Sequence, residues 1–108
     1  MTTVITVEHD GDQLWWSLQE LTTSTQLAPE FVVQCVECGV MEASGPQVQW
    51  RFDVEARQRL QRAWRLHRDL ELHVSALPIV IDLLEEMENL REEAHRLRGR
   101  LQHWELRE

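Results

Sequence analysis

Residues 17–39, SLQELTTSTQLAPEFVVQCVECG, carry the signals of two short helices separated by a polar turn. A serine and a glutamate three residues apart, Ser17 and Glu20, form the pattern of a capping box, which predicts a helix over about residues 18–23. A second helix is predicted between a proline suited to a first helical turn and a glycine suited to a left-handed end, Pro29 and Gly39. Two short helices joined in this way predict a helix-turn-helix.

Four further elements are predicted outside this unit. They are a short strand over the β-branched residues 2–8, a hairpin around the Gly-Pro pair of residues 40–52, a helix over residues 53–72, and a break at residues 73–78. Asp53 is the expected cap of the long helix, because its side chain accepts hydrogen bonds from unpaired helical N–H groups. Pro78 is tolerated only in a first turn, so a last helix is expected to begin near it, with Ser75 as its cap.

From residue 80 onward, apolar residues recur at spacings of three and four for four heptads, which is typical of a coiled coil. The predicted dimerisation seam consists of Val80, Leu83, Met87, Leu90, Ala94, Leu97, Leu101 and Trp104. In a parallel pair the flanking charges have opposite signs, whereas an antiparallel pair sets Glu93 against its own copy. Each exposed charge pair contributes only ~0.3–0.5 kcal/mol, against ~1.5–3 kcal/mol for a buried apolar side chain. The seam therefore predicts a homodimer and leaves the polarity of its helices open.

The charged residues are divided sharply along the chain. Residues 1–50 contain seven acidic residues and no Lys or Arg, whereas all eleven basic residues are arginines that lie from Arg51 onward. A surface built from the first half alone is acidic, and it would repel a polyanion. The asymmetry predicts a positively charged partner for this half.

Composition and length exclude several classes of protein. At 108 residues, the chain has room for one small domain and an appendage. Its longest apolar run, residues 76–81, is too short to cross a bilayer, and the N-terminus lacks the basic start of a secretory signal, so a cytoplasmic location is expected. No glycine-rich phosphate loop and no nucleophile with a suitable base is evident, so we expect neither an enzyme nor a cofactor.

The two cysteines, Cys35 and Cys38, have the C-x-x-C spacing that metal and redox sites also use. A structural zinc site needs about four ligands, and the sequence has no second pair of Cys or His residues at a suitable spacing. Redox pairs sit at the N-terminus of a helix, whereas these cysteines lie at the C-terminal end of the predicted second helix. We therefore expect two buried or half-buried thiols and no metal.

Four segments in this order and spacing resemble the chaperone-modulator (CbpM-type) family: CVECGVME, WRFD, VEARQRLQRAWRLHRDLELHV and PIVIDLLEEMENLREEAHRLRGRL. The resemblance implies a mainly α fold, a MerR-type winged helix-turn-helix with a short β-hairpin wing, followed by a long C-terminal coiled-coil helix. We place the acidic winged-helix head at residues 1–74 and the dimerisation helix at residues 75–108. The family resemblance further implies binding to the J-domain of a DnaJ-like (CbpA-type) co-chaperone, inhibition of its action with Hsp70, and suppression of its DNA binding.

J-domains have a basic second helix, which an acidic head would complement. The predicted partner-binding residues are therefore Glu20, Glu30, Glu37 and Glu42, with Trp15 or Trp16 as an apolar anchor. The two tryptophans cannot both point inward if their segment is extended, because successive side chains of a strand face opposite sides. At least one of them is then available to a partner.

Direct DNA binding is the alternative that a winged helix-turn-helix suggests. Its second helix would enter the major groove, yet residues 29–38 contain no Lys or Arg to neutralise phosphates and carry two glutamates instead. The evidence in favour is segment 51–68, with six arginines and two acids, although arginines on a helix commonly pair with nearby acids. The residue types argue against DNA as the direct partner and leave a MerR-like transcriptional regulator as the second hypothesis.

Overall fold

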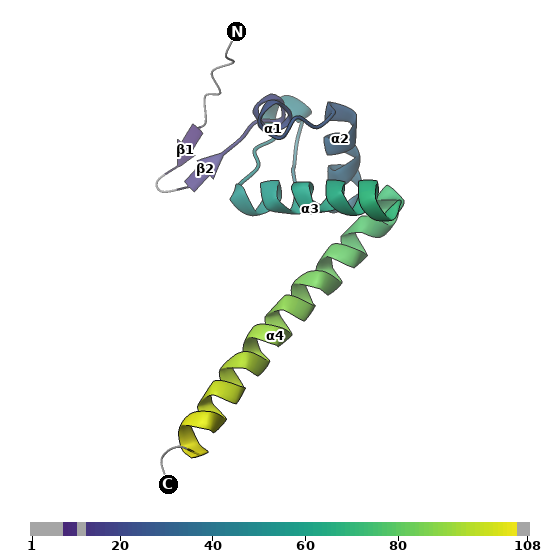
Figure 1. Ribbon diagram of the computed structural model, residues 1–108. Coiled ribbons are helices and arrows are strands. Elements are labelled where there is room, and N and C mark those ends of the chain that lie inside the picture. Colours follow the sequence, from purple (N-terminus) through teal and green to yellow (C-terminus); the bar gives the residue numbers. More distant parts are fainter. Residues whose placement is uncertain (1–7, 11–12, 106–108) are drawn as a thin grey trace. The chain divides into compact units, whose positions relative to one another are not determined.

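The computed structural model describes residues 8–10 and 13–105 (Figure 1). In chain order, its elements are β1 (Glu8–Asp10), β2 (Gln13–Trp15), α1 (Leu18–Thr25), α2 (Pro29–Cys38), a 3₁₀ turn (Gln47–Gln49), α3 (Val54–Leu70), a second 3₁₀ turn (Val74–Ala76) and α4 (Leu77–Glu105). The chain divides into two compact units, Met1–Pro78 and Ile79–Glu108, which we name the head unit and the helical unit. The boundary predicted between residues 74 and 75 stays a prediction.

The predicted helix-turn-helix is present as α1 and α2, and local hydrogen bonds account for where both helices begin and end. The Glu20 N–H donates to the Ser17 hydroxyl (3.2 Å), and the Ser17 N–H donates to the Glu20 carboxylate (2.9 Å), which completes the predicted capping box. Pro29 opens α2, and Gly39 ends it in the left-handed region, with φ of 97°. The Val40 N–H then donates to the Cys35 carbonyl (2.8 Å), which satisfies one of the last free carbonyls of the helix.

A short hairpin is present, but it precedes the helix-turn-helix. Strands β1 and β2 pair antiparallel, with Glu8 opposite Trp15. The predicted strand at residues 2–8 lies, except for its last residue, outside the described residues.

The hairpin predicted within residues 40–52 is wrong. The Trp50 indole N–H donates to the Gly45 carbonyl (3.0 Å), and the Trp50 backbone N–H donates to the Gln47 carbonyl (3.1 Å), so the loop closes on itself instead of forming two paired arms. Phe52 forms a bridge with Trp16, far back in the sequence, through two backbone hydrogen bonds of 2.8 Å each.

Helix α3 begins where the sequence predicts. The Ala56 N–H donates to the Asp53 carboxylate (2.8 Å), and Leu60 and Ala63 are fully buried on one face of the helix. The chain breaks after α3 as expected. His73 caps the second 3₁₀ turn, where its Nδ1 accepts from the Ser75 N–H (3.2 Å), and Ser75, the predicted cap of the last helix, lies within this turn.

The core of the head unit is apolar and includes aromatic contacts between distant segments. Phe31 of α2 packs edge-on against Trp64 of α3, with ring centroids 5.2 Å apart, and Trp50 packs edge-on against Phe52 at 6.1 Å. The buried core residues of this unit are Leu21, Phe31, Val32, Cys35, Val40, Met41, Trp50, Phe52, Leu60, Ala63 and Leu77. Trp50 and Trp64 therefore pack against other aromatic rings of the head unit.

Helix α4 supplies the helical unit, and Figure 1 draws it as one uninterrupted helix. Leu77 and Ile81, near its start, are buried, whereas most of the large apolar side chains further along it are exposed. Those of the predicted seam that are more than a third exposed are Leu83, Met87, Leu90, Leu97, Leu101 and Trp104. Within residues 8–10 and 13–105, no helix combines the length and the apolar character that crossing a bilayer requires.

Candidate partner-binding site

The exposed side of α2 is acidic. Glu30 and Glu37 are both exposed, and because they are seven residues apart they lie at nearly the same angular position on the helix. The opposite side carries Phe31, Val32 and Cys35, which pack into the core. Burial of the apolar stripe therefore determines that these two carboxylates face solvent.

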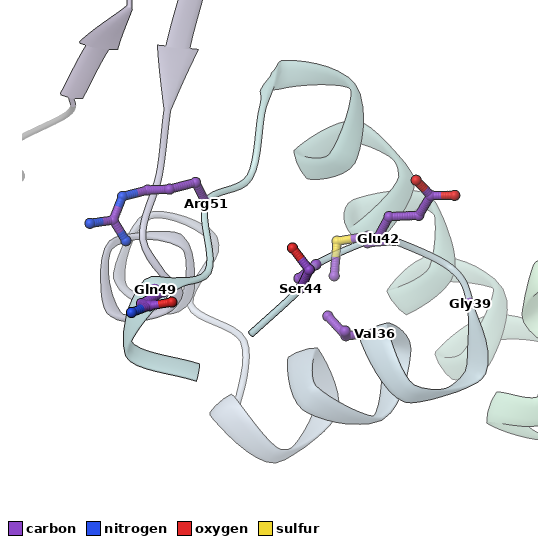
Figure 2. A pocket seen from close by; sticks show the side chains of 8 residues that line it. Val36, Gly39, Glu42, Ser44, Gln49 and Arg51 are labelled. Carbon is purple, nitrogen blue, oxygen red and sulfur yellow. The ribbon is translucent and has the colours of Figure 1, made fainter. Parts of the chain in front are cut away.

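Glu42 is exposed where the chain leaves α2, and it lines an open pocket of about 630 Å³. Figure 2 shows the pocket between the C-terminal end of α2 and the loop that leads to α3. Residues from both segments line it, among them Val36, Gly39, Glu42, Ser44, Gln49 and Arg51. We name it the α2–loop pocket.

Glu20 differs from the other predicted acidic contacts. It is half-buried, and its carboxylate accepts the capping hydrogen bond from the Ser17 N–H. One carboxylate oxygen is thus already occupied in stabilising the start of α1, whereas Glu30, Glu37 and Glu42 are exposed.

Trp15 and Trp16 are both half-buried at the end of the hairpin, in the extended conformation that places successive side chains on opposite faces. The backbone of Trp16 pairs with Phe52, and the guanidinium of Arg57 lies 5.7 Å from the centroid of the Trp16 ring. That distance is within the range of a cation–π interaction. Trp16 therefore joins the hairpin to α3, which leaves Trp15 as the stronger candidate for an anchor.

Comparison with known proteins decides the family. The model of the MerR HTH family of regulatory proteins matches residues 16–99. The chaperone modulatory protein CbpM of Pseudomonas entomophila is 36% identical over 86 residues, which cover 78% of this chain and 84% of that protein. Its namesake in Salmonella arizonae is 33% identical over 87 residues, which cover 80% and 86% of the two chains. The chain belongs to the chaperone-modulator (CbpM) family. Its head is of the MerR helix-turn-helix type.

In this chaperone-modulator chain, three arginines of α3 make contacts within the head unit. The Arg59 Nε–H donates to the Val40 carbonyl (2.7 Å), and Arg57 stacks on Trp16. Among the buried side-chain nitrogen and oxygen atoms that the structure describes, the Arg57 Nε has no hydrogen-bond partner. Arg68 forms an exposed pair with Asp69 (2.8 Å), and its hydrogen bond lowers the pKa of that carboxyl group. Part of the basic segment that favoured DNA binding is therefore engaged inside the protein.

The two thiols of the chaperone modulator are free, and they are buried or half-buried as predicted. Burial, with a smaller contribution from the neighbouring Cys38, raises the pKa of Cys35 to about 12. The Cys38 Sγ–H points at the carbonyls of Cys35 (3.7 Å) and Val74 (3.5 Å). Because a protonated thiol is a poor nucleophile and a poor metal ligand, Cys35 is suited to packing. Among the residues with described positions, no group of three or more His, Cys, Asp or Glu side chains gathers to hold a metal.

Sequence reasoning identified the acidic residues but missed the α2–loop pocket. The pocket depends on Gly39 and Gly45, two left-handed glycines that turn the chain at each end of the segment between them. The sequence signal was present, since both glycines occur in turn contexts. Gly39 is the predicted end of the second helix, which the structure confirms, whereas Gly45 was predicted to turn a hairpin.

Proposed function

We propose that this chain binds the J-domain of a DnaJ/CbpA-like co-chaperone in the cytoplasm and inhibits its action with Hsp70 and its DNA binding. The role is one of binding and not of catalysis. The observation that carries the proposal is the acidic exposed side of α2, in a head whose first fifty residues contain no Lys or Arg. Membership of the chaperone-modulator family supports the same partner class. A basic helix of a J-domain is complementary in charge to this surface.

The proposed contact residues are Glu30, Glu37 and Glu42, with Trp15 or Trp16 as the apolar anchor. Glu20 contributes mainly to the start of α1, because its carboxylate is held in the capping box. Exposed carboxylates steer a cationic partner toward the surface and disfavour wrong partners, whereas the apolar anchor supplies affinity on contact.

We further propose that the seam of α4 pairs with that of a second copy, so that the protein is a homodimer. Most apolar side chains of the seam are exposed in the single chain, and burying them against a partner helix would contribute ~1.5–3 kcal/mol for each fully buried residue. A dimer would present two acidic heads to J-domain partners.

Direct DNA binding as a MerR-like regulator is the second candidate, and the family match of the head favours it. The absence of any basic residue on α2 opposes it, because phosphate neutralisation supplies most nonspecific affinity for DNA. A gel shift at low salt that depends on Arg51, Arg57 and Arg62 would support this candidate over the first.

The J-domain proposal is tested by reversing charges at matched positions. The double variant Glu30→Lys/Glu37→Lys changes two exposed glutamates on one face of α2, and Glu88→Lys/Glu92→Lys makes the same change in net charge on α4. In calorimetric titration with the isolated J-domain of a co-chaperone from the same genome, we expect the α2 variant to bind roughly 100-fold more weakly, since juxtaposed like charges cost several kcal/mol. The α4 variant should bind within about twofold of the unmodified protein. Equal loss in both variants, or no binding by the unmodified protein, would contradict the proposal.

A further inference from the structure

The loop between α2 and α3 is held in one shape by its own hydrogen bonds. Gly45 has φ of 79°, and its carbonyl accepts from the Trp50 indole N–H (3.0 Å), while the Gln49 N–H donates to the Pro46 carbonyl (2.9 Å). The indole that closes the loop is itself buried in the core. A partner that contacts this loop therefore pays little conformational entropy for ordering it.

The fixed loop lines the α2–loop pocket, and an exposed apolar residue of this loop, Val48, directly precedes one of the lining residues in the chain. Ser44 and Gln49 of the loop line the pocket together with Val36, which lies near the C-terminal end of α2 (Figure 2). Val48, next to Gln49, is 84% exposed. A single exposed valine is ordinary on a protein surface. The apolar lining of the pocket itself comes from Val36, Ala43 and the buried Met41.

Two side chains of opposite charge, Glu42 and Arg51, line the pocket. Figure 2 shows Glu42 and Arg51 at opposite ends of the pocket. The Arg51 guanidinium also donates to the Trp50 carbonyl (2.8 Å), which holds it near the loop. A cationic side chain of a partner is attracted at the Glu42 end of the pocket.

We propose that the α2–loop pocket receives an apolar side chain from a basic helix of the protein partner, while a Lys or Arg of the same helix pairs with Glu42. This inference rests on the proposed function and adds to it the anchor point of the partner. The acidic side of α2 then supplies attraction, and the pocket determines where the partner helix comes to rest.

Filling the pocket tests this inference. The variants Ser44→Trp and Gln49→Trp each place a large side chain in the pocket from an exposed position, and Gln47→Trp adds the same side chain to the same loop outside the lining. The probe is the isolated J-domain of a co-chaperone from the same genome, titrated into the full chain, with the thermal unfolding of each variant recorded by circular dichroism. We expect the two pocket variants to bind about tenfold or more weakly, because a buried apolar side chain contributes that much affinity. Gln47→Trp should bind within about twofold of the unmodified protein.

The outcomes separate this inference from the function on which it rests. If the unmodified protein and Gln47→Trp both fail to bind the J-domain, the proposed function is overturned and the inference with it. If both bind, and the two pocket variants bind as tightly as the unmodified protein, the pocket inference is overturned while the proposed function stands. Because the two substitutions enter from different positions of the loop, a folding defect in one of them leaves the other as the test.

Discussion

The head unit buries most of its regularly spaced apolar residues, whereas the helical unit leaves most of its own exposed. In the head unit, leucines such as Leu21 and Leu60 are completely buried, and aromatic rings join α2 to α3 and the loop to Phe52. In the helical unit, leucines such as Leu90 and Leu97 remain about half exposed although their spacing is equally regular. Apolar periodicity alone thus predicts a face that will be covered, and not whether the same chain covers it. The head buries its apolar pattern internally, whereas α4 leaves most of its apolar seam exposed in the single chain.

Matched leucine substitutions should give the largest difference between the two units. Leu60→Ala removes a fully buried side chain of α3, and Leu90→Ala removes an exposed one of α4. In dilute protein, below the concentration at which copies associate, we expect Leu60→Ala to lower the free energy of unfolding by ~2–5 kcal/mol and Leu90→Ala to change it by less than about 0.5 kcal/mol. Urea unfolding followed by tryptophan fluorescence measures both. Equal losses would show that α4 is covered within a single chain, and the comparison would fail.

Self-association should depend on the seam and not on charge as such. Leu90→Asp places a carboxylate in the seam, whereas Asn89→Asp places one on the neighbouring exposed position outside it. Because a homodimer loses the apolar contact twice and must also desolvate two charges, we expect Leu90→Asp to weaken dimerisation at least ~100-fold. Asn89→Asp should have little effect. Sedimentation equilibrium over a range of concentrations would measure the change, and a chain that is monomeric before any substitution would disprove the proposed dimer.

Reversing one glutamate in each unit should give the smallest effect. Glu20→Lys breaks the hydrogen bond that the Ser17 N–H donates at the start of α1, and it places a cation at the positive end of the helix dipole. We expect a loss of about 1 kcal/mol in the free energy of unfolding, against less than about 0.5 kcal/mol for Glu92→Lys on exposed α4. Glu20→Gln, which keeps a hydrogen-bond acceptor, should recover most of the difference in the same urea titration. If Glu20→Lys is as stable as the unmodified protein, the carboxylate is free to act as a partner contact after all.

The elements that could be predicted from sequence are those whose ends depend on neighbouring residues. The capping box of Ser17 and Glu20, the left-handed Gly39 and the Asp53 cap each involve groups within a few positions of one another, and the structure confirms all three. The hairpin around Gly45 was wrong for the opposite reason. Its residues are compatible with paired strands, but the Trp50 indole closes the loop, and Phe52 pairs with a residue thirty-six positions earlier, Trp16.

The candidate site was predictable to a similar extent. The sign of its surface follows from composition, because residues 1–50 offer no positive charge that any fold could bring to it. Packing of Phe31, Val32 and Cys35 then exposes Glu30 and Glu37, which helical periodicity alone implies. The engagement of Arg57 with Trp16 could not be predicted, since it joins the hairpin to α3.

By itself, the sequence determined the helix-turn-helix, the regular seam of α4 and the acidic character of the first fifty residues, because periodicity, capping and net charge are properties of neighbouring residues or of simple totals. Tertiary structure decided that helix α4 keeps most of its apolar seam exposed in the single chain, that the loop after α2 lines an open pocket, and that Trp16 contacts Phe52 and Arg57. These features arise from contacts between residues far apart in the chain. Such contacts form only when the summed burial of the core outweighs the entropy of closing the intervening loops, and no short stretch of sequence contains that balance.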